Sequence, residues 1–511
     1  MNNPGWATFI ILRFNIRHSA VYFFLKPAFS FGMLPPPCHD GGGDYALGMA
    51  DDILIIGAGM SGLAAGVRLA HFGRRVLVCE RHRVAGGLNS WYRRAGREIN
   101  TGLHAMTNFV PASARQAPLN VLLRQLRLSR DEFQFRPQTA SEVRFPDVVL
   151  PFTNDPAVAE AAIAAAFPAD LDGYRRLVAE VRAGDPFNLT NTHLSARTQL
   201  ARFLRSPQLT ELLMCPVLFY GGYAANDVGW NDFLILFNGL FLEGLARPAG
   251  GIRPLLERLA ARLAEGGGEL RLGCGVRHLV VRDGRIAAAM LDDGTELAPA
   301  AVLSTIGWPE TWALLNAPPP ALAAPRPGEV AFVETLLRLD QPPAALGVAP
   351  CVAFISETAR FHYGRPAAPV DPDSLIVCAP DNFAPPPSGT VTEPERTLHV
   401  TQLADFAPWF AASPEAYRQL KAATLAATQA RAEARYPGLR GHVTAAELFT
   451  PCTITRFTGR RNGAIYGSPD KCRDGRTPLD NLYLAGTDQG FLGIVGSLLS
   501  GVAMANRHLL R

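Results

Sequence analysis

ILIIGAGMSGLAAGVRLAHFGRRVLVCERHRVAGG, at residues 53–87, decides the fold of this chain. An apolar run of strand length, Ile53–Ile56, leads into GAGMSG, and Val76–Cys79 has the apolar character of a second buried strand. One apolar helix face is formed between them by Leu63, Val67 and Ala70. A strand, a glycine-rich turn, a helix and a second parallel strand make up the βαβ unit that binds adenine dinucleotides.

The three glycines of this motif have separate physical roles. Gly57 permits a tight turn, Gly59 lets the backbone approach a pyrophosphate, and Gly62 lets the helix pack closely on the strand. The phosphates are then expected at the helix N-terminus, where free N–H groups and the helix dipole favour negative charge. Glu80 ends the second strand and is placed to accept hydrogen bonds from a ribose diol, which disfavours a 2′-phosphate and therefore NADP.

Length and composition indicate a globular protein of two intertwined domains. A chain of 511 residues is too long for one simple core. With 48% hydrophobic and 18% charged residues it is slightly apolar, which suits a protein that encloses an apolar cavity. The net charge of +4 is small, and no basic run or aromatic-basic repeat occurs, so nucleic acid is not an expected partner.

The eight cysteines have neither CxxC nor metal-ligand spacing, and Cys38 next to His39 lacks further ligands. We therefore expect no metal site, and reduced thiols in a cytoplasmic protein. Residues 1–48 lie outside the predicted fold, and charged residues interrupt their apolar runs before a membrane span is reached. Because this architecture normally begins just before the first strand, Met49 is the expected functional start; an amphipathic, membrane-associated extension is the alternative.

The middle of the chain changes character. Helical patterns near 119–128, 156–166 and 174–181 lead to an apolar, Phe-rich stretch that ends at Leu245. This stretch is consistent with an apolar substrate cavity, with membrane docking or with buried helical core. Helix 414–436 is predicted in a later segment, between proline-rich connections and the C-terminal strand, glycine loop and helix.

From Arg247 the chain returns to α/β patterns. We predict a helix, a strand near 270–276, a β-hairpin around Asp283-Gly284, and another buried strand of the nucleotide domain within 300–307. The FAD-binding domain is therefore expected to comprise 49–109, 247–310 and 445–511. The substrate domain comprises 110–246 and 311–444.

GAGMSG with Glu80, the Gly86-Gly87 pair, PAGG at 248–251 and LYLAGTDQGFLGIVGSLLSG at 482–501 together resemble the FAD-dependent superfamily of phytoene desaturases, carotenoid isomerases and retinol saturases. The resemblance implies an α/β protein. A Rossmann-like FAD-binding domain, of the glutathione-reductase and amine-oxidase type, is expected with an interleaved α+β substrate domain. It also implies an apolar isoprenoid or polyene substrate, whose C–C or C=C bonds would be desaturated, saturated or isomerised by hydride exchange at flavin N5.

The same resemblance assigns the FAD contacts. The C-terminal pattern GxDxxxxGxxGxL begins at Gly486, and its Asp488 would accept hydrogen bonds from the flavin ribityl or from neighbouring amides, while the helix N-terminus would face the flavin O2/N1 edge. Val276 would contact the adenine through its backbone. Many relatives have Arg where this chain has Leu88, so a phosphate contact there is in doubt. The full expected set is Gly57, Ala58, Gly59, Ser61, Gly62, Glu80, Arg81, Gly87, Leu88, Val276, Gly486, Asp488, Gly493, Ile494 and Val495.

Few residues are candidates for catalysis, because the cofactor supplies the redox chemistry. His104 follows the loop that approaches the flavin in this superfamily, and it is the candidate acid or polar orienter; a structural histidine is the alternative. Tyr466 could line the cavity or simply pack. The electron partner stays open between a quinone, oxygen and a diffusible nicotinamide, since no second GxGxxG occurs. Peripheral membrane contact is a further expectation.

Three alternative functions share this fold. Flavin amine oxidases usually carry a lysine near flavin N5 in the strand that corresponds to 333–338, where this chain has VETLLR. Protoporphyrinogen oxidase is a weaker alternative on similar grounds. Prenyl-protein escort proteins bind lipids without redox chemistry, but their FAD site is generally degraded, whereas both glycine motifs are intact here.

Overall fold

The computed structural model describes residues 52–94, 96–184, 194–318, 323–389 and 393–510. The predictions for residues 1–48, for a start at Met49 and for Cys38 and His39 lie outside the described residues.

A five-stranded parallel sheet forms the centre of the nucleotide domain, with strand order β19-β13-β1-β2-β9. Its strands come from three distant parts of the chain: β1 (Ile53–Ile56), β2 (Val76–Glu80), β9 (Glu269–Leu272), β13 (Ala301–Ser304) and β19 (Leu482–Leu484). Strand β1 is entirely buried, as expected for a parallel strand covered on both faces. The predicted βαβ unit and the predicted strand within 300–307 are therefore confirmed.

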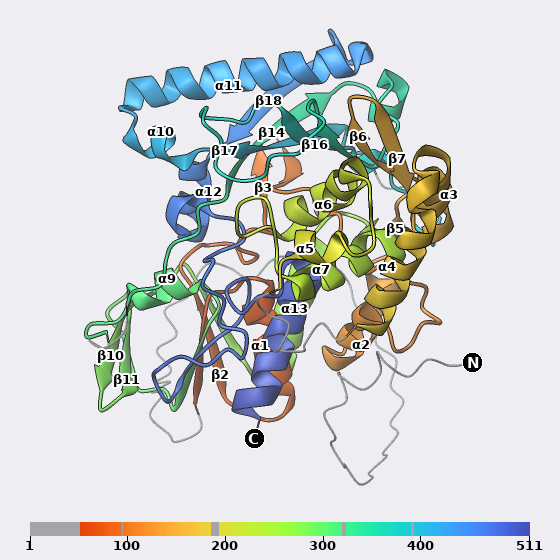
Figure 1. The fold of residues 1–511 in the computed structure, drawn as a ribbon. Coiled ribbons are helices and arrows are strands. Elements are labelled where there is room, and N and C mark those ends of the chain that lie inside the picture. The colour runs from red at the N-terminus through yellow and green to blue at the C-terminus, as the bar shows by residue number, and fades with distance from the viewer. Residues whose placement is uncertain (1–51, 95, 185–193, 319–322, 390–392, 511) are drawn as a thin grey trace.

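Helices cover one face of this sheet and a small antiparallel sheet covers the other (Figure 1). Helix α1 (Met60–His71) packs between α8 (Arg253–Glu265) and the C-terminal α13 (Gly493–Met504). The opposite face meets the predicted hairpin, β10 (Val276–Arg282) and β11 (Arg285–Leu291), which a short β12 (Glu296–Leu297) extends. A second hairpin, β3 (Trp91–Arg94) and β4 (Arg97–Asn100), follows the first unit.

The second domain is built on a seven-stranded mixed sheet, in the order β18-β14-β17-β16-β15-β6-β7. The bounds of its strands are β6 (Ser141–Phe145), β7 (Val148–Phe152), β14 (Ala331–Leu339), β15 (Val352–Ser356), β16 (Ser374–Cys378), β17 (Thr397–Ala404) and β18 (Val443–Phe449). Among the described residues, five α-helices of this domain precede β14: α3 (Pro156–Ala166), α4 (Leu171–Ala183), α5 (Ala196–Leu200), α6 (Pro207–Gly221) and α7 (Trp230–Phe237). Helix α2 (Pro118–Gln125) instead packs its buried leucines into the core of the nucleotide domain and contacts α13.

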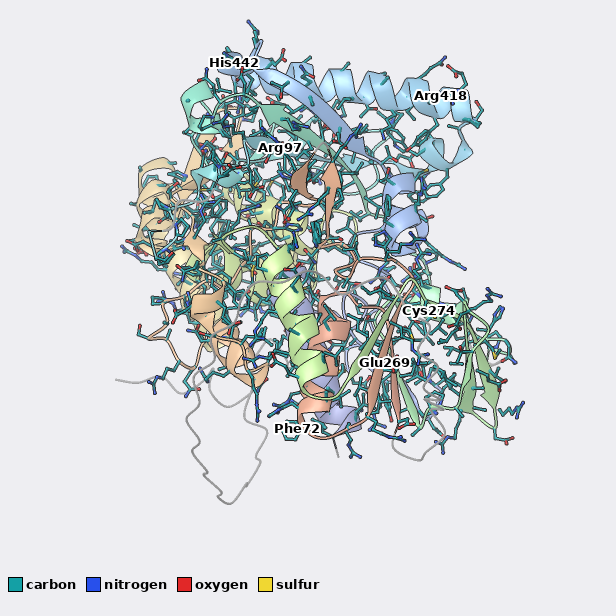
Figure 2. The ribbon with its side chains drawn as sticks, turned by 180° about the vertical axis from the view of Figure 1, so that it is seen from behind. Phe72, Arg97, Glu269, Cys274, Arg418 and His442 are labelled. Carbon is teal, nitrogen blue, oxygen red and sulfur yellow. The ribbon has the colours of Figure 1, made fainter. Side chains whose placement is uncertain are left out.

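The two faces of this sheet differ. One packs on the apolar α6 and α7, which form a large aromatic core with it. The other contacts residues of α11 (Pro414–Arg435), the long helix that runs along the outer edge of the molecule, with α10 (Phe406–Ala411) before it. In the reverse view, Arg418 and His442 lie at this outer end, and Phe72, at the end of α1, lies at the opposite end (Figure 2).

Three sequence-based boundaries need correction. The predicted strand near 270–276 is two strands, because Gly273 adopts a left-handed conformation (φ +71°) and separates β9 from β10. The domain boundary at 444/445 cuts through β18, which pairs with β14, so the second domain continues to Phe449. Likewise β8 (Ala246–Arg247) spans the boundary drawn at 246/247 and pairs with β5 (Arg136–Pro137) of the second domain.

Candidate flavin and substrate site

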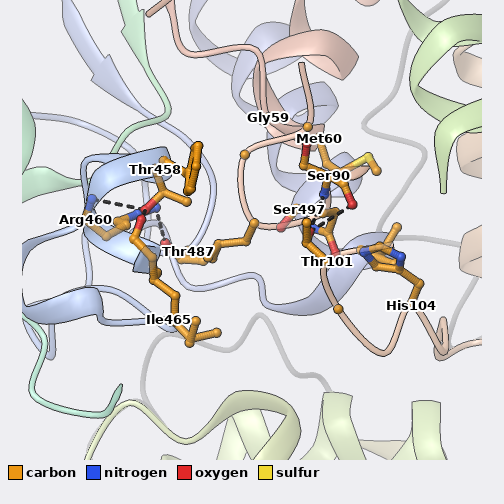
Figure 3. Close-up of a pocket in the computed structure, with 18 of the residues that line it drawn as sticks. Gly59, Met60, Ser90, Thr101, His104, Thr458, Arg460, Ile465, Thr487 and Ser497 are labelled. Atoms are coloured by element: carbon orange, nitrogen blue, oxygen red, sulfur yellow. Dashed lines mark hydrogen bonds between the residues drawn. The ribbon is translucent and has the colours of Figure 1, made fainter. Parts of the chain in front are cut away.

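One cavity of about 530 Å³ lies where the two domains meet, and it joins the two distant glycine motifs. Gly57, Gly59 and Glu80 line it from the N-terminal unit, and Gly486 and Gly493 line it from the C-terminal motif. Figure 3 shows Arg460 and Thr487 on one side of this cavity and Ser90, Thr101 and His104 on the other. Residues more than 400 positions apart in the chain therefore form one site.

Helices α1 and α13 meet at the cavity through an unusually close backbone contact. A Cβ added at Gly501 would lie 2.1 Å from the Ser61 carbonyl oxygen, and the Ser61 hydroxyl donates to the Ser497 carbonyl over 2.8 Å. Neither helix has a side-chain cap at its N-terminus. Two sets of free N–H groups, each at the positive end of a helix dipole, therefore lie beside the cavity, as anionic phosphates and a reduced flavin require.

The first turn is shaped for a ligand by its glycines and by Glu80. Gly57 has φ +96°, and a Cβ there would lie 2.8 Å from the Thr305 hydroxyl. The Glu80 carboxylate accepts hydrogen bonds from the backbone N–H of Ala58 and of His82, both over 2.8 Å, and it lines the cavity. The carboxylate is thus fixed at the end of β2, where a ribose diol would be bound.

The other expected FAD contacts divide into two groups. Ser61, Gly87, Leu88 and Ile494 line the cavity. Gly62 and Val495 support it from behind, and Arg81 donates to the carbonyls of Thr455 and Arg456. Val276 lies at the buried start of β10 and does not line the cavity.

Asp488 lies behind the cavity wall, where it orders two backbone segments. Its carboxylate accepts from the N–H of Trp308 over 2.6 Å and from that of Ser468 over 3.0 Å. Two buried cations flank it: Arg460 Nη1 lies 3.6 Å away and Lys471 Nζ 4.0 Å away. Asp488 was expected to accept hydrogen bonds from the flavin ribityl or from neighbouring amides, and the contacts described here are with amides.

Arg460 is a site residue that the sequence analysis missed. Its Nη2 donates to the Thr487 hydroxyl over 2.7 Å, while its buried Nη1 has no hydrogen-bond partner. Both Arg460 and Thr487 line the cavity. Nη1 lies near two carboxylates, 3.6 Å from Asp488 and 3.8 Å from Glu310, and a cation that lines the cavity suits a polar or anionic edge of a cofactor. These features together fit an FAD: residues 57–62 and Glu80 would hold the adenosine diphosphate part, and Arg460, Thr487 and α13 the flavin.

Burial changes the proton affinity of Lys471. Its ammonium donates to the carbonyls of Tyr466 and Thr487, and burial lowers its pKa to about 8, although Asp488 and Asp232 oppose the shift. An unfolded chain has the usual value of 10.5, so between pH 8 and 10.5 the unfolded state binds more protons at this residue. This residue therefore makes the folded protein more stable as pH rises through that window.

We expect the wild-type free energy of unfolding, minus that of Lys471→Met, to rise between pH 8 and 10.5. Below about pH 7 the difference should be constant, since Lys471 is then protonated in both states. Urea unfolding of both proteins at a series of pH values measures it. A flat difference across the window would show that the Lys471 pKa is not lowered.

Much of the rest of the cavity is apolar. Phe219, Phe332, Ile376 and Ile465 line it, and so do the rings of Tyr220 and Tyr466. The Phe-rich stretch that ends at Leu245 is therefore mainly buried core, and it contributes Phe219 and Tyr220 to the wall. Tyr466 lines the cavity and donates from its hydroxyl to the Phe219 carbonyl.

His104 lines the cavity, and both of its ring nitrogens are buried without a hydrogen-bond partner. Burial, with the nearby Arg247 and His399, lowers its pKa well below the usual value. The ring is therefore neutral at pH 7, which favours a polar orienter over an acid. In β14, where amine oxidases are expected to have lysine, Glu334 faces the cavity instead.

Among the described residues there is no group of three or more His, Cys, Asp or Glu side chains that could hold a metal ion. The seven described cysteines are free thiols, and burial raises the pKa of Cys79 and Cys378 to about 12. No helix in the described part of the chain is long and apolar enough to span a membrane.

Curated relatives with similar sequences include a chloroplastic prolycopene isomerase of an Oncidium hybrid cultivar, 22% identical over 89% of this chain and 83% of the relative. The all-trans-retinol 13,14-reductase of Danio rerio is 23% identical over 90% of this chain and 86% of the relative. The neurosporene-forming phytoene desaturase of Rhodobacter capsulatus is 25% identical over 49% of this chain and 51% of the relative.

Solved structures show the same fold. An oxidoreductase from Methanosarcina mazei matches with a TM-score of 0.60 and 17% identity, over 89% of this chain and all of its own. Cyclohexylamine oxidase from Brevibacterium oxydans matches with a TM-score of 0.56 and 15% identity, over 90% and 98%. The family model described as flavin containing amine oxidoreductase matches residues 60–327, which is more than half of the chain. The chain therefore belongs to the flavin-containing amine oxidoreductase family and is an FAD-dependent oxidoreductase.

Proposed function

We propose that this enzyme desaturates, saturates or isomerises C–C or C=C bonds of an apolar isoprenoid or polyene. The observation that carries the proposal is the cavity, in which the flavin-binding elements lead directly to a wall of phenylalanine, isoleucine and tyrosine side chains. An elongated hydrocarbon is stabilised there by removal of its apolar surface from water. The names of the relatives, which refer to prolycopene, phytoene and retinol, support the same substrate class.

Bound FAD supplies hydride exchange with the substrate carbon, and this chain's residues supply orientation and a dry cavity. His104 would orient the substrate or the flavin through its unpartnered ring nitrogens. Arg460 would place a positive charge beside the flavin and so favour its reduced, anionic form. A diffusible quinone, oxygen or nicotinamide would exchange the electrons. Isomerisation would rearrange the substrate without net redox change.

Amine oxidation is the second candidate. The chain's fold matches amine oxidases, yet β14 presents Glu334 to the cavity and Lys471 bonds to carbonyls behind the wall. Anaerobic incubation of the FAD-loaded enzyme with prolycopene, phytoene or all-trans-retinol, and separately with putrescine, distinguishes the two, with products analysed by chromatography. We expect a changed polyene. Unchanged polyenes together with an oxidised amine would reverse the assignment.

We also propose that the protein is cytoplasmic and that it contacts a membrane surface peripherally. Phe457 of α12 (Pro451–Thr458) lines the cavity while 47% of it remains exposed, and Phe410 on the contacting helix α10 is 47% exposed as well. Exposed aromatic rings at a cavity mouth are suited to the interface of a lipid layer. Sedimentation with vesicles should therefore be weaker for Phe457→Ser than for wild type, and equal sedimentation would count against this membrane contact.

A further inference from the structure

Glu334 is an ionisable side chain in the apolar part of the cavity. It projects from the middle of β14 on the same face as Phe332, which also lines the cavity, whereas Leu337 and Leu339 face the core on the other side of the sheet. A carboxylate among aromatic and aliphatic side chains is costly unless its charge is balanced or hydrogen-bonded. Its presence there therefore calls for a physical explanation.

The neighbouring strand holds this carboxylate in a fixed orientation. Glu334 Oε1 lies 2.7 Å from His399 Nδ1, and Oε2 accepts from the Thr401 hydroxyl over 2.6 Å. Thr401 is the direct cross-strand partner of Glu334, and His399 is two residues away on β17. The His399 side chain is only 1% exposed, whereas that of Glu334 is 12% exposed. The carboxylate is thus in contact with the cavity, and the imidazole supports it from behind.

A second buried polar group lies in the same cavity. His104 has both ring nitrogens unpartnered, and its neutral form is favoured by burial and by Arg247 and His399. Behind these residues Arg247 forms a buried ion pair with Glu395 over 2.9 Å. The groups that surround the Glu334–His399 pair are therefore Thr401 and the paired strand β17, Cys378 on β16, His104 in its loop, and the Arg247–Glu395 ion pair.

We propose that Glu334, positioned by His399, is the catalytic proton acceptor and donor of the reaction, which rests on the polyene function proposed above. In desaturation, two C–H bonds on adjacent carbons break and a C=C bond forms. One hydrogen leaves as hydride to the oxidised flavin, which gains two electrons, and the other leaves as a proton to a Glu334 carboxylate oxygen. In saturation the same atoms move in reverse: protonated Glu334 gives its proton to one carbon while the reduced flavin gives hydride to the other.

Fixed hydrogen bonds suit this role, because proton transfer requires a base held within reach of the reacting carbon. The His399 imidazole, 2.7 Å from Oε1, holds the carboxylate in place as its hydrogen-bond partner. A dry cavity also prevents water from taking the proton instead. A purely structural buried pair would not need to be in contact with the cavity.

The test compares Glu334→Gln with wild type and with Glu142→Gln. Glutamine keeps the size of Glu334 and one acceptor oxygen, and its amide N–H can donate to the Thr401 hydroxyl, but it cannot take the proton. Glu142 is a carboxylate on β6 of the same sheet, paired with Arg144 over 2.9 Å, and it does not line the cavity. Three quantities are measured for each protein. They are the FAD content, the affinity for the polyene that wild type converts, followed by the shift in polyene absorbance, and the rate of single-turnover flavin bleaching as a function of pH.

We expect Glu334→Gln to keep its FAD and to bind the polyene within about threefold of wild type, while the turnover rate falls at least about 100-fold, as general acid–base groups contribute. The ionisation visible in the wild-type pH profile of that rate should disappear. Glu334→Asp should restore part of the rate, and Glu142→Gln should behave as wild type. His399→Gln should lower the rate less than Glu334→Gln and shift the pH profile, because His399 acts through Glu334.

Three results would overturn the proposal. A wild-type rate in Glu334→Gln would show that the carboxylate transfers no proton. A weaker binding with an unchanged rate of the bound complex would make Glu334 a substrate-binding residue only. If wild type converts none of the polyenes, both the proposed function and the proton role of Glu334 are wrong. If wild type is active and Glu334→Gln is equally active, only the proton role is wrong.

Discussion

Gly62→Ala should yield a protein without FAD. A Cβ at position 62 would lie 1.9 Å from the Gly57 carbonyl oxygen and 3.1 Å from its carbon, and this obstacle is backbone that a rotamer change cannot move. The turn that carries Gly57 at φ +96° must shift, and with it the N–H groups that would face the pyrophosphate. We expect FAD content near zero and a loss of about 3 kcal/mol in the free energy of unfolding.

Gly66→Ala on the same helix is the matched control. Its new Cβ would meet only side-chain atoms, Leu263 Cδ1 and Val78 Cγ2, each 3.1 Å away, which can move slightly. Alanine also favours the helix by about 0.5–1 kcal/mol over glycine. The FAD content, measured as flavin absorbance per protein, and the free energy of unfolding in urea are compared between the two variants. A yellow, fully loaded Gly62→Ala protein would contradict the close approach of α1 to β1.

Asp488→Asn should destabilise the protein strongly and weaken its hold on FAD. Both carboxylate oxygens accept backbone N–H groups, from Trp308 and Ser468, so an amide nitrogen at either position would face another donor. The substitution also leaves the buried cations Arg460 and Lys471 without their shared anion. Removal of one partner from a buried charge cluster costs about 3–5 kcal/mol.

Asp470→Asn provides the comparison, because Asp470 pairs with Arg326 at the surface. Such an exposed pair contributes little to stability. Chemical denaturation and the rate of FAD release on dilution measure both effects. Equal stabilities of the two variants would mean that the charges of Arg460 and Lys471 are balanced by other groups, and that Asp488 does not organise the wall of the site.

Local patterns were sufficient where the chain folds on itself within a short distance. Strand β1, helix α1 and the hairpin around Asp283-Gly284 lie where the alternation and turn signals indicate. Helix α11 begins at Pro414, as predicted, after Ser413, which accepts a hydrogen bond from the Ala416 N–H. Such signals are short-range, because capping, turn geometry and apolar periodicity involve residues a few positions apart.

The same short-range patterns did not predict which distant strands pair with each other. The sequence analysis assigned residues 445–449 to the last FAD-binding segment, but this strand pairs with β14, which lies more than 100 residues earlier. Glu334 and His399 are 65 positions apart, and only the register of β14 and β17 brings them together. Arg460 carries no recognisable motif, since its role depends on burial next to Thr487 and Asp488.

The sequence by itself determined that this protein holds an adenine dinucleotide, because a phosphate site needs glycines and an acid at fixed short spacings, which are visible in the chain as GAGMSG and Glu80. The resemblance that these residues carry together with the C-terminal glycine motif specified FAD. Only the tertiary structure decided what surrounds the reacting end of the cavity. Its aromatic wall, the free nitrogens of His104 and the Glu334–His399 pair come from strands and loops that meet through packing. Side-chain chemistry at a site depends on burial and on neighbours in space, which spacing along a chain does not specify.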